Sequence, residues 1–182
     1  MVDKTKNKIL DAALKIFARD GYKSATTRNI AQESGFSEIT LFRKFETKEN
    51  LFKEAMTCNH EKLQQSCFSI VNDLDQKFGD PKKFIEVYIN RMAIFFKKNF
   101  EFFNLMVTED NLHIDNDMGE FGKFMGNFIE KNINNSEVNG EILAITINTY
   151  LYMLNLEISK GLSKNEIDDM VDKFSKNILN CF

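Results

Sequence analysis

Residues 26–52, which read TTRNIAQESGFSEITLFRKFETKENLF, decide the fold of the N-terminal part of the chain. Thr26, Ser37 and Thr47 are good helix N-caps, and each precedes a run with apolar residues three or four apart. Gly35 is placed to end the first of these runs. The stretch therefore predicts two short helices joined by a tight turn, followed by the start of a longer helix.

A further helix is expected ahead of this stretch, from residue 4 to residue 20, with Asp3 as its N-cap and Gly21 as its end. Its apolar residues recur with the helical period at Ile9, Leu10, Ala13, Leu14 and Phe17. The two short helices are expected to pack their apolar residues against this stripe, which makes a helix-turn-helix. The outer face of the second short helix is then free to enter a DNA major groove.

Several spaced blocks of this head resemble the DNA-binding domain of the TetR family of transcriptional regulators. They are Gly21-Tyr22, residues 25–31 (ATTRNIA), 35–37 (GFS), 40–45 (TLFRKF) and 48–52 (KENLF). The resemblance covers about residues 5 to 55 in one ungapped register. It implies a three-helix head that binds operator DNA, and a body, usually of six helices, that binds a small-molecule effector and forms a homodimer.

Residues of the head divide into candidate base readers and candidate phosphate contacts. Arg28 is predicted to donate to both O6 and N7 of a guanine. The alternative interpretation is that Arg28 is a surface arginine that contacts only solvent. Lys48 lies at a helix N-terminus, which favours a phosphate, and phosphate contact is also the role that the resemblance implies. The predicted DNA-binding residues are Thr26, Thr27, Arg28, Ser37, Glu38, Ile39, Thr40, Phe42, Arg43, Lys44 and Lys48.

Some of these positions carry open alternatives. The hydroxyl groups among the candidates could contact phosphate or only cap helices. Phe42 stands where the family often has tyrosine, so no phenolic hydroxyl can reach a phosphate there. Ile39 replaces a frequent glycine and could meet a thymine methyl, while Glu38 could accept from cytosine N4 or repel phosphate.

The remainder of the chain predicts six helices, over residues 48–78, 82–98, 100–109, 116–133, 137–161 and 163–181. The expected fold is therefore all-α, with nine helices in a helix-turn-helix head and a ligand-binding and dimerisation body. We place the head at residues 1–47 and the body at 48–182, where 48–78 is a connecting helix. The low Gly and Pro content, 8 and 1 of 182 residues, agrees with long helices.

The segment 137–161 is apolar on nearly every face of a helix. Such a helix in a soluble protein must be covered on more than one side, either by a symmetry mate or by deep burial in a monomer. The resemblance implies that the last two helices pair with their mates in a four-helix bundle. The predicted dimer contacts are Ile142, Ile145, Thr149, Tyr152, Met153, Phe174 and Ile178.

Phenylalanine and methionine are concentrated in the body, which holds thirteen of the 18 Phe beyond residue 56. Most of these side chains are expected to form the core. With the sensor role that the resemblance implies, adaptable Met and aromatic walls would also suit an apolar or aromatic effector. The predicted ligand-binding residues are Tyr88, Met92, Phe95, Phe96, Phe103, Met106, Phe121, Phe124, Met125, Phe128 and Asn148.

The charge of the chain is divided between its parts. Residues 1–56 hold 11 Lys or Arg and 8 Asp or Glu, a net charge of +3, whereas the remainder holds 13 and 19, a net charge of −6. A basic head that meets a polyanion and an acidic body with another role would explain the division. The sequence has no nucleophile motif, phosphate-binding loop or metal-ligand spacing, so we expect no enzyme activity, cofactor or metal. It also has no signal peptide, so we expect no membrane span and a cytoplasmic location.

These observations favour a ligand-responsive transcriptional regulator, most plausibly a repressor that binds a palindromic operator as a homodimer and leaves it when an effector fills the body. The alternative is a ligand-binding or scaffold protein with a degenerate helix-turn-helix that no longer reads DNA, because of Phe42 and Glu38.

Overall fold

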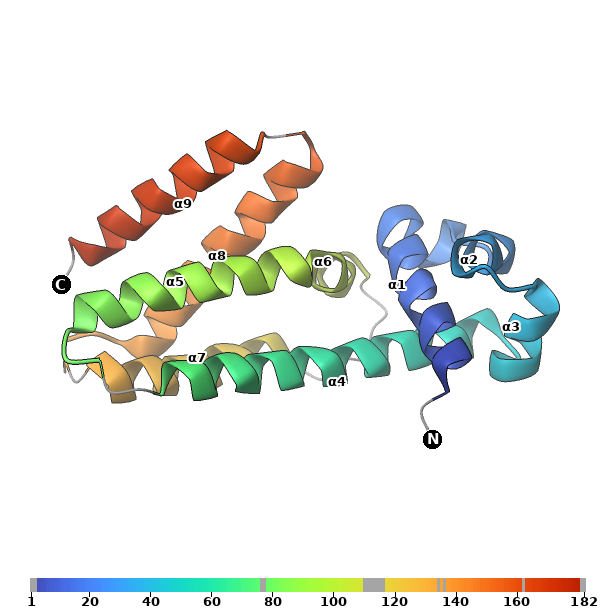
Figure 1. Cartoon of the computed structure of the whole chain (residues 1–182), viewed down its shortest axis with the longest axis horizontal. Coiled ribbons are helices and arrows are strands. Elements are labelled where there is room, and N and C mark those ends of the chain that lie inside the picture. The colour runs from blue at the N-terminus through green and yellow to red at the C-terminus, as the bar shows by residue number, and fades with distance from the viewer. Residues whose placement is uncertain are drawn as a thin grey trace. The chain divides into compact units, whose positions relative to one another are not determined.

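The computed structural model describes residues 3–75, 78–109, 117–133, 135, 137–161 and 163–180 (Figure 1). These residues form nine α-helices and no strand, as the sequence predicts. The helices are α1 (Lys4–Ser24), α2 (Thr27–Ser34), α3 (Glu38–Phe45), α4 (Lys48–Leu74), α5 (Pro81–Lys98), α6 (Phe100–Thr108), α7 (Asp117–Ile133), α8 (Gly140–Ser159) and α9 (Lys164–Leu179).

The chain divides into two compact units. The first comprises Met1–Gln65 and Glu101–Leu112, and the second comprises Ser66–Phe100 and His113–Phe182. Helices α1, α2, α3 and α6 belong to the first unit, whereas α5, α7, α8 and α9 belong to the second, and α4 contributes to both. The two units are defined by which residues pack together. The predicted boundary between residues 47 and 48 is instead based on expected function, and it stays a prediction.

The helix starts in the first unit follow the predicted capping residues, whereas α1 continues past the predicted end at Gly21 to Ser24. The side chains of Asp3, Thr26 and Ser37 each accept a hydrogen bond from a backbone N–H in the first turn of α1, α2 and α3. Gly35 ends α2 in the left-handed conformation at φ 75°, and Gly21 interrupts α1 near its end at φ 73°. Both conformations suit glycine, because a Cβ atom makes positive φ unfavourable.

The core of the first unit forms where α2, α3 and the start of α4 cover one face of α1. Ile9, Ala13, Phe17, Ile30 and Leu51 are at most 1% exposed. The Phe17 ring meets the Phe52 ring edge-on with centroids 4.9 Å apart. This core fixes α3 by its inner face and leaves its outer face uncovered.

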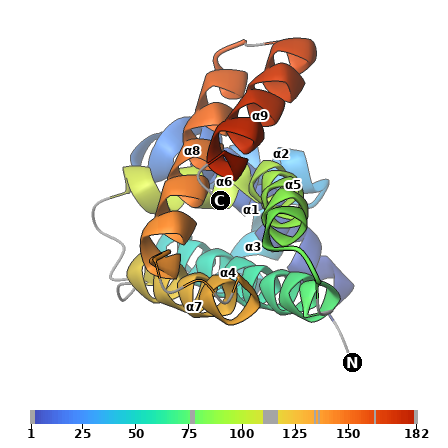
Figure 2. The ribbon, with the colours of Figure 1, turned by 90° about the vertical axis from the view of Figure 1, so that its left-hand side faces the viewer.

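The second unit is built on very close packing of α7 against α8, and α8 passes from α7 to α9 (Figure 2). Gly126 and Gly140 lie at the crossing, where the Gly140 N–H donates to Oε1 of Glu130 over 2.8 Å. Asn139 caps α8 through the N–H of Ile142, so α8 begins at Gly140, three residues later than the predicted start at 137. The absence of side chains at the two glycines allows the backbones to approach.

Gly126→Ala is expected to destabilise the protein by about 1–3 kcal/mol, because its Cβ would lie 2.6 Å from the backbone of Glu141. Helix propensity alone would favour this substitution by about 1 kcal/mol, so a net loss isolates the steric overlap. Urea unfolding measures the change. Gly79→Ala is the matched control, since its Cβ would meet nothing within 4 Å. Equal stability of both variants would show that α7 and α8 do not pack this closely.

Helix α8 is long and apolar enough, by length and composition, to cross a membrane, with a mean hydropathy of 1.2 over its most apolar window. Two amides, Asn148 and Asn155, are nevertheless buried on the side that packs against neighbouring helices. Only 33% of the window is buried, so much apolar surface of α8 remains uncovered in a single chain. A second protein surface that covers the exposed apolar side of α8 would account for this feature.

Candidate functional site

Helix α3 presents one face to the core and the other to solvent. Leu41 and Phe45 are buried, whereas the side chain of Ile39 is 80% exposed and that of Phe42 is 49% exposed. Ile39 and Phe42 lie three residues apart and together form a small exposed apolar patch, and such patches can mark an interaction site. The exposed face of α3 is therefore the candidate recognition surface.

The four basic candidates of the head divide into two pairs. Arg28 and Arg43 are exposed, and neither makes an ion pair or hydrogen bond with the described part of the chain. Lys44 is engaged, since its Nζ lies 2.6 Å from Oδ2 of Asp3. This bond and the Lys44 charge hold the pKa of Asp3 below its usual value. Of these four candidates, the two arginines are thus the ones whose donors are all free of partners in the described residues.

Lys48 has a structural role that the sequence did not reveal. Its Nζ donates to the backbone oxygens of Tyr22 at 2.7 Å, Lys23 at 3.3 Å and Ala25 at 3.0 Å. It also lies 4.5 Å from the centre of the Tyr22 ring, a cation–π distance. These bonds use the three donors of the ammonium group, so Lys48 holds the turn between α1 and α2, and its phosphate contact stays a prediction.

The hydroxyl candidates are also used within the head. Thr26 accepts from the N–H of Asn29, and Ser37 accepts from the N–H of Thr40 while the hydroxyls of Ser37 and Thr40 lie 3.0 Å apart. Thr27 donates to Oε2 of Glu38 over 3.2 Å. Glu38 is therefore turned toward α2 and half-buried, which reduces the repulsion it would exert on a phosphate. Capping does not exclude phosphate contact, since a hydroxyl oxygen can accept and donate at once.

A functional contact outside the predicted set joins α6 to the same turn. Glu109, the residue after α6, accepts a hydrogen bond at Oε1 from the N–H of Tyr22 over 2.7 Å. Lys48 thus holds the carbonyl oxygen of Tyr22 and Glu109 holds its N–H. No local pattern around residue 109 signals a partner 87 residues away, so the sequence analysis missed it.

Most of the predicted ligand-binding residues form the core of the second unit. Tyr88, Met92, Phe95, Phe96, Met125 and Phe128 are 0–7% exposed, and the half-buried Phe121 ring stacks on Phe95 with centroids 6.1 Å apart. Phe103 and Met106 lie instead on α6, in the first unit. Phe124 lies on the surface, 40% exposed, in an edge-on pair with Phe68. Its role in ligand binding stays a prediction.

Two polar atoms in that core lack a partner among the described residues. They are the hydroxyl of Tyr88 and Oδ1 of Asn148, on the neighbouring helices α5 and α8. Burial raises the pKa of Tyr88 far above its usual value, so its hydroxyl stays protonated and can donate. An unsatisfied buried polar group costs about 1–3 kcal/mol, and each one requires an explanation such as a bound molecule.

The predicted dimer contacts lie on a partly open face of α8 and α9. The side chains of Ile142, Ile145 and Met153 are 65%, 47% and 47% exposed, and Thr149 is exposed as well. Tyr152, Phe174 and Ile178 are half-buried, and the Phe174 ring stacks on Tyr150 at 3.9 Å. The exposed members share one stripe of α8, with spacings of three and four residues.

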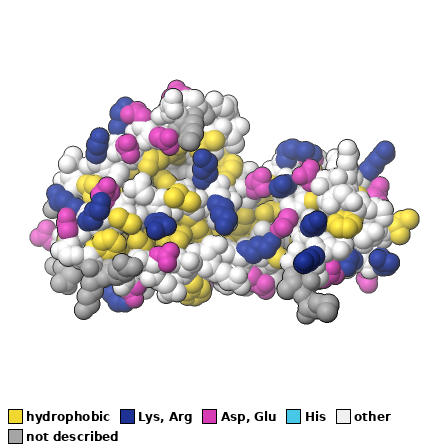
Figure 3. All heavy atoms as spheres, in the orientation of Figure 1, with side chains coloured by type: hydrophobic (Ala, Val, Ile, Leu, Met, Phe, Trp, Pro, Cys, Tyr) yellow, Lys and Arg dark blue, Asp and Glu magenta, His cyan; other side chains and the backbone are white. Residues whose placement is uncertain are grey.

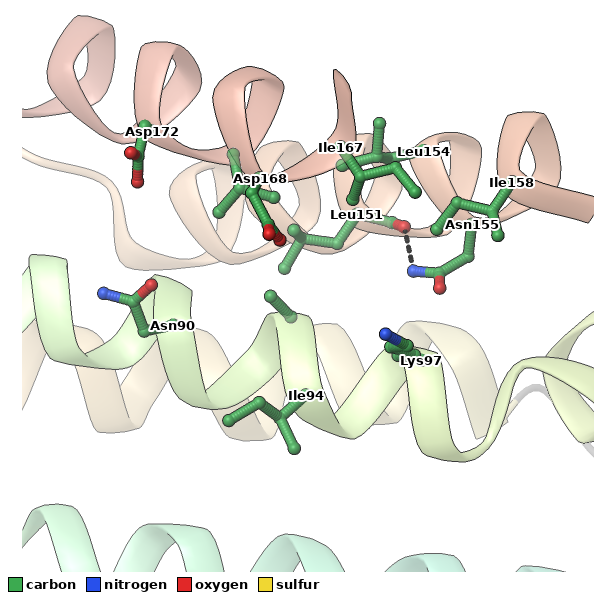
Figure 4. A pocket seen from close by; sticks show the side chains of 12 residues that line it. Asn90, Ile94, Lys97, Leu151, Leu154, Asn155, Ile158, Ile167, Asp168 and Asp172 are labelled. Carbon is green, nitrogen blue, oxygen red and sulfur yellow. Dashed lines mark hydrogen bonds between the residues drawn. The ribbon is translucent and has the colours of Figure 1, made fainter. Parts of the chain in front are cut away.

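A cleft of about 310 Å³ opens between α5, α8 and α9, wholly within the second unit (Figure 4). Its walls include apolar side chains such as Ile94, Leu151 and Leu154, and its polar residues include Asn90, Lys97, Asn155, Asp168 and Asp172. Apart from Asn90, which the sequence offers as a possible polar contact for the effector, none of the predicted ligand-binding residues lines it.

The fold and the head together define an all-α protein with an N-terminal helix-turn-helix. Residues 9–55 match the family model described as bacterial regulatory proteins, tetR family. The head is therefore similar to the corresponding part of a family of bacterial regulatory proteins.

Two curated relatives match the N-terminal part of the chain. One is the uncharacterized HTH-type transcriptional regulator YvkB of Bacillus subtilis, 37% identical over 76 residues, which are 42% of this chain and 36% of that protein. The other is the HTH-type transcriptional regulator QacR of Staphylococcus aureus, 40% identical over 60 residues, which are 33% of this chain and 32% of that protein. The matched part thus spans about a third of either relative.

The fold likeness extends over the whole chain. The fatty acid degradation regulator FadR of Bacillus halodurans superposes with a TM-score of 0.73, covering 98% of this chain and 96% of that one, at 16% sequence identity. The body therefore has the fold found in that regulator, while its sequence has diverged too far to transfer a ligand.

Proposed function

We propose that the chain is a cytoplasmic, ligand-responsive transcriptional repressor that binds a palindromic operator as a homodimer and leaves it when a small apolar or aromatic effector occupies the body. The observation that carries this proposal is the outer face of the head. Arg28 and Arg43 have free donors, and Ile39 is exposed on α3, which lies within the residues that match the tetR-family model.

The contacts expected on DNA differ in kind. Arg28 and Arg43 can donate to guanine edges or phosphates, and Ile39 suits a thymine methyl. The hydroxyl candidates would contact phosphates, which positions the head on the duplex but reads no sequence. Two heads related by two-fold symmetry would read an inverted repeat.

Selection from a pool of random duplex DNA tests the proposal. At low salt, repeated capture on the immobilised protein is expected to enrich a palindromic site, and Arg28→Ala and Arg43→Ala together are expected to abolish the enrichment. Failure of the wild-type protein to enrich any palindrome would refute operator binding and favour the scaffold alternative.

The unpartnered atoms of Tyr88 and Asn148 support an effector site in the core between α5 and α8. The surrounding core residues carry no charge, so a neutral group that accepts from the tyrosine and donates to the amide would fit there. The apolar and aromatic neighbours would hold the rest of the effector. Tightly packed side chains would have to move on entry, and methionine adapts well to such changes.

Tyr88→Phe is expected to stabilise the effector-free protein by about 1 kcal/mol, because it removes a buried hydroxyl that has no partner. Urea unfolding measures the change. Tyr22→Phe is a control with a half-buried tyrosine in the other unit. A loss of about 1 kcal/mol for Tyr88→Phe would instead mean that a permanent internal partner, such as water, satisfies the hydroxyl.

A further inference from the structure

The cleft between α5, α8 and α9 lies apart from the predicted effector residues and carries its own set of polar groups. Its floor is apolar, formed by Ala93 of α5 and by Leu151 and Leu154 of α8. Figure 3 shows hydrophobic side chains in the hollow between α5 and the α8–α9 pair, with charged side chains around them. A volume of about 310 Å³ is sufficient for a small organic molecule.

The charges at the cleft have no partners of their own. Asp168 and Asp172 lie one helical turn apart on α9 and project toward α5 (Figure 4), while Lys97 lies at the other end. None of the three forms an ion pair or hydrogen bond with the described residues. The two carboxylates face one ammonium group, so the cleft has a net negative charge.

A buried amide adds a second indication of a ligand. Asn155 is 6% exposed, and its Nδ2 donates to the backbone oxygen of Leu151 over 2.8 Å. Its Oδ1 accepts no hydrogen bond from the described residues, and Figure 4 shows it directed toward α5. This oxygen and the carboxylates above it are all acceptors, so a ligand that donates hydrogen bonds suits the cleft.

We propose that this cleft binds a small organic cation, a protonated amine with an apolar body. The ammonium group lies between Asp168 and Asp172, and the apolar body covers Leu151 and Leu154. Lys97 is exposed on a flexible stem, so its charge can turn to solvent and does not oppose the ligand.

Titration of the full chain with octylamine, followed by the backbone amide shifts of α5 and α9, tests the proposal. Octylamine is expected to saturate shifts at Ala93 and Val171, whereas octanol and octanoate bind at least about tenfold more weakly, since neither brings a positive charge to the carboxylates. The proposal that the cleft binds an organic cation would be overturned if octylamine showed no saturable binding, or if octanoate bound more tightly than octylamine.

Charge-removing variants locate the site. Asp168→Asn with Asp172→Asn is expected to weaken octylamine binding about tenfold, the effect of two partly exposed ion pairs. Both positions are exposed, so the fold is expected to persist. Asp169→Asn is the matched control, because Asp169 lies on the same helix but pairs with Lys173 and does not line the cleft. Equal losses in both variants, or no loss in either, would contradict the site.

Discussion

Ile142→Glu is expected to convert the proposed homodimer into a folded monomer and to reduce operator affinity by at least about a hundredfold. A charge placed in an apolar seam opposes association strongly, because the core of an interface excludes charged groups. The side chain is 65% exposed in a single chain, so the monomer loses little by the change. Each head can then hold only one half-site, without the gain that comes from linking two.

Sedimentation at micromolar concentration and circular dichroism give the two readouts for Ile142→Glu. Ile94→Glu is the matched control, because Ile94 is 64% exposed and lies on α5, away from the predicted seam. The control is expected to remain a dimer. A wild-type protein that sediments as a monomer, or an Ile142→Glu protein that remains a dimer, would contradict the α8–α9 assembly.

Lys48→Met is expected to have the largest effect within the head, a loss of about 3 kcal/mol of unfolding free energy. Methionine keeps the apolar stem but removes the hydrogen bonds to the carbonyls of Tyr22, Lys23 and Ala25, and hydrogen bonds from charged donors are the stronger kind. The turn that leads into α2 then loses its anchor. Operator affinity is expected to fall for all DNA sequences alike.

Arg28→Ala is the comparison that separates a loss of stability from a loss of DNA contact. Arg28 is exposed and has no partner within the described residues, so stability is expected to change by less than about 0.5 kcal/mol. Operator binding is expected to weaken by about 1–3 kcal/mol, with relaxed preference at one base position. If Lys48→Met kept wild-type stability and lowered the salt slope of binding by about one unit, Lys48 would be a phosphate contact instead.

Local patterns predicted the elements of this fold well. Capping by Asp3, Thr26 and Ser37 and the positive φ of Gly35 depend on a few neighbouring residues, so the sequence contains all that is needed to predict them. The late start of α8 also has a local cause, the cap at Asn139, but the apolar pattern of 137–161 concealed it.

The site was less predictable because its chemistry depends on distant partners. The family resemblance suggested Lys48 for phosphate, yet its ammonium group meets carbonyls 23 to 26 residues away. Glu109 contacts Tyr22 across 87 residues, and Phe124 shares a helix with buried side chains but points outward. The cleft could not be predicted either, because three helices that are separate in sequence form it.

The coupling between effector and operator sets a quantitative expectation. An effector that weakens operator binding tenfold requires about 1.4 kcal/mol of coupling, and operator must weaken effector binding by the same factor. Helix α4 contributes to both compact units, and Glu109 ties the end of α6 to the turn that Lys48 holds. We propose that these two elements carry the coupling.

A spacing series on the selected operator tests the central claim most directly, namely that two heads of one dimer read two half-sites. Half-sites about 10 base pairs apart, or a multiple of this, face the same side of the duplex. Inserting about 5 base pairs between them turns one half-site to the opposite side, and affinity is expected to fall to that of a single half-site. Inserting a full turn of about 10 base pairs keeps both half-sites on the same side of the duplex and changes only their separation. This insertion tests whether the two heads can span a longer distance. Unchanged affinity after the half-turn insertion would contradict recognition by a rigid two-headed dimer.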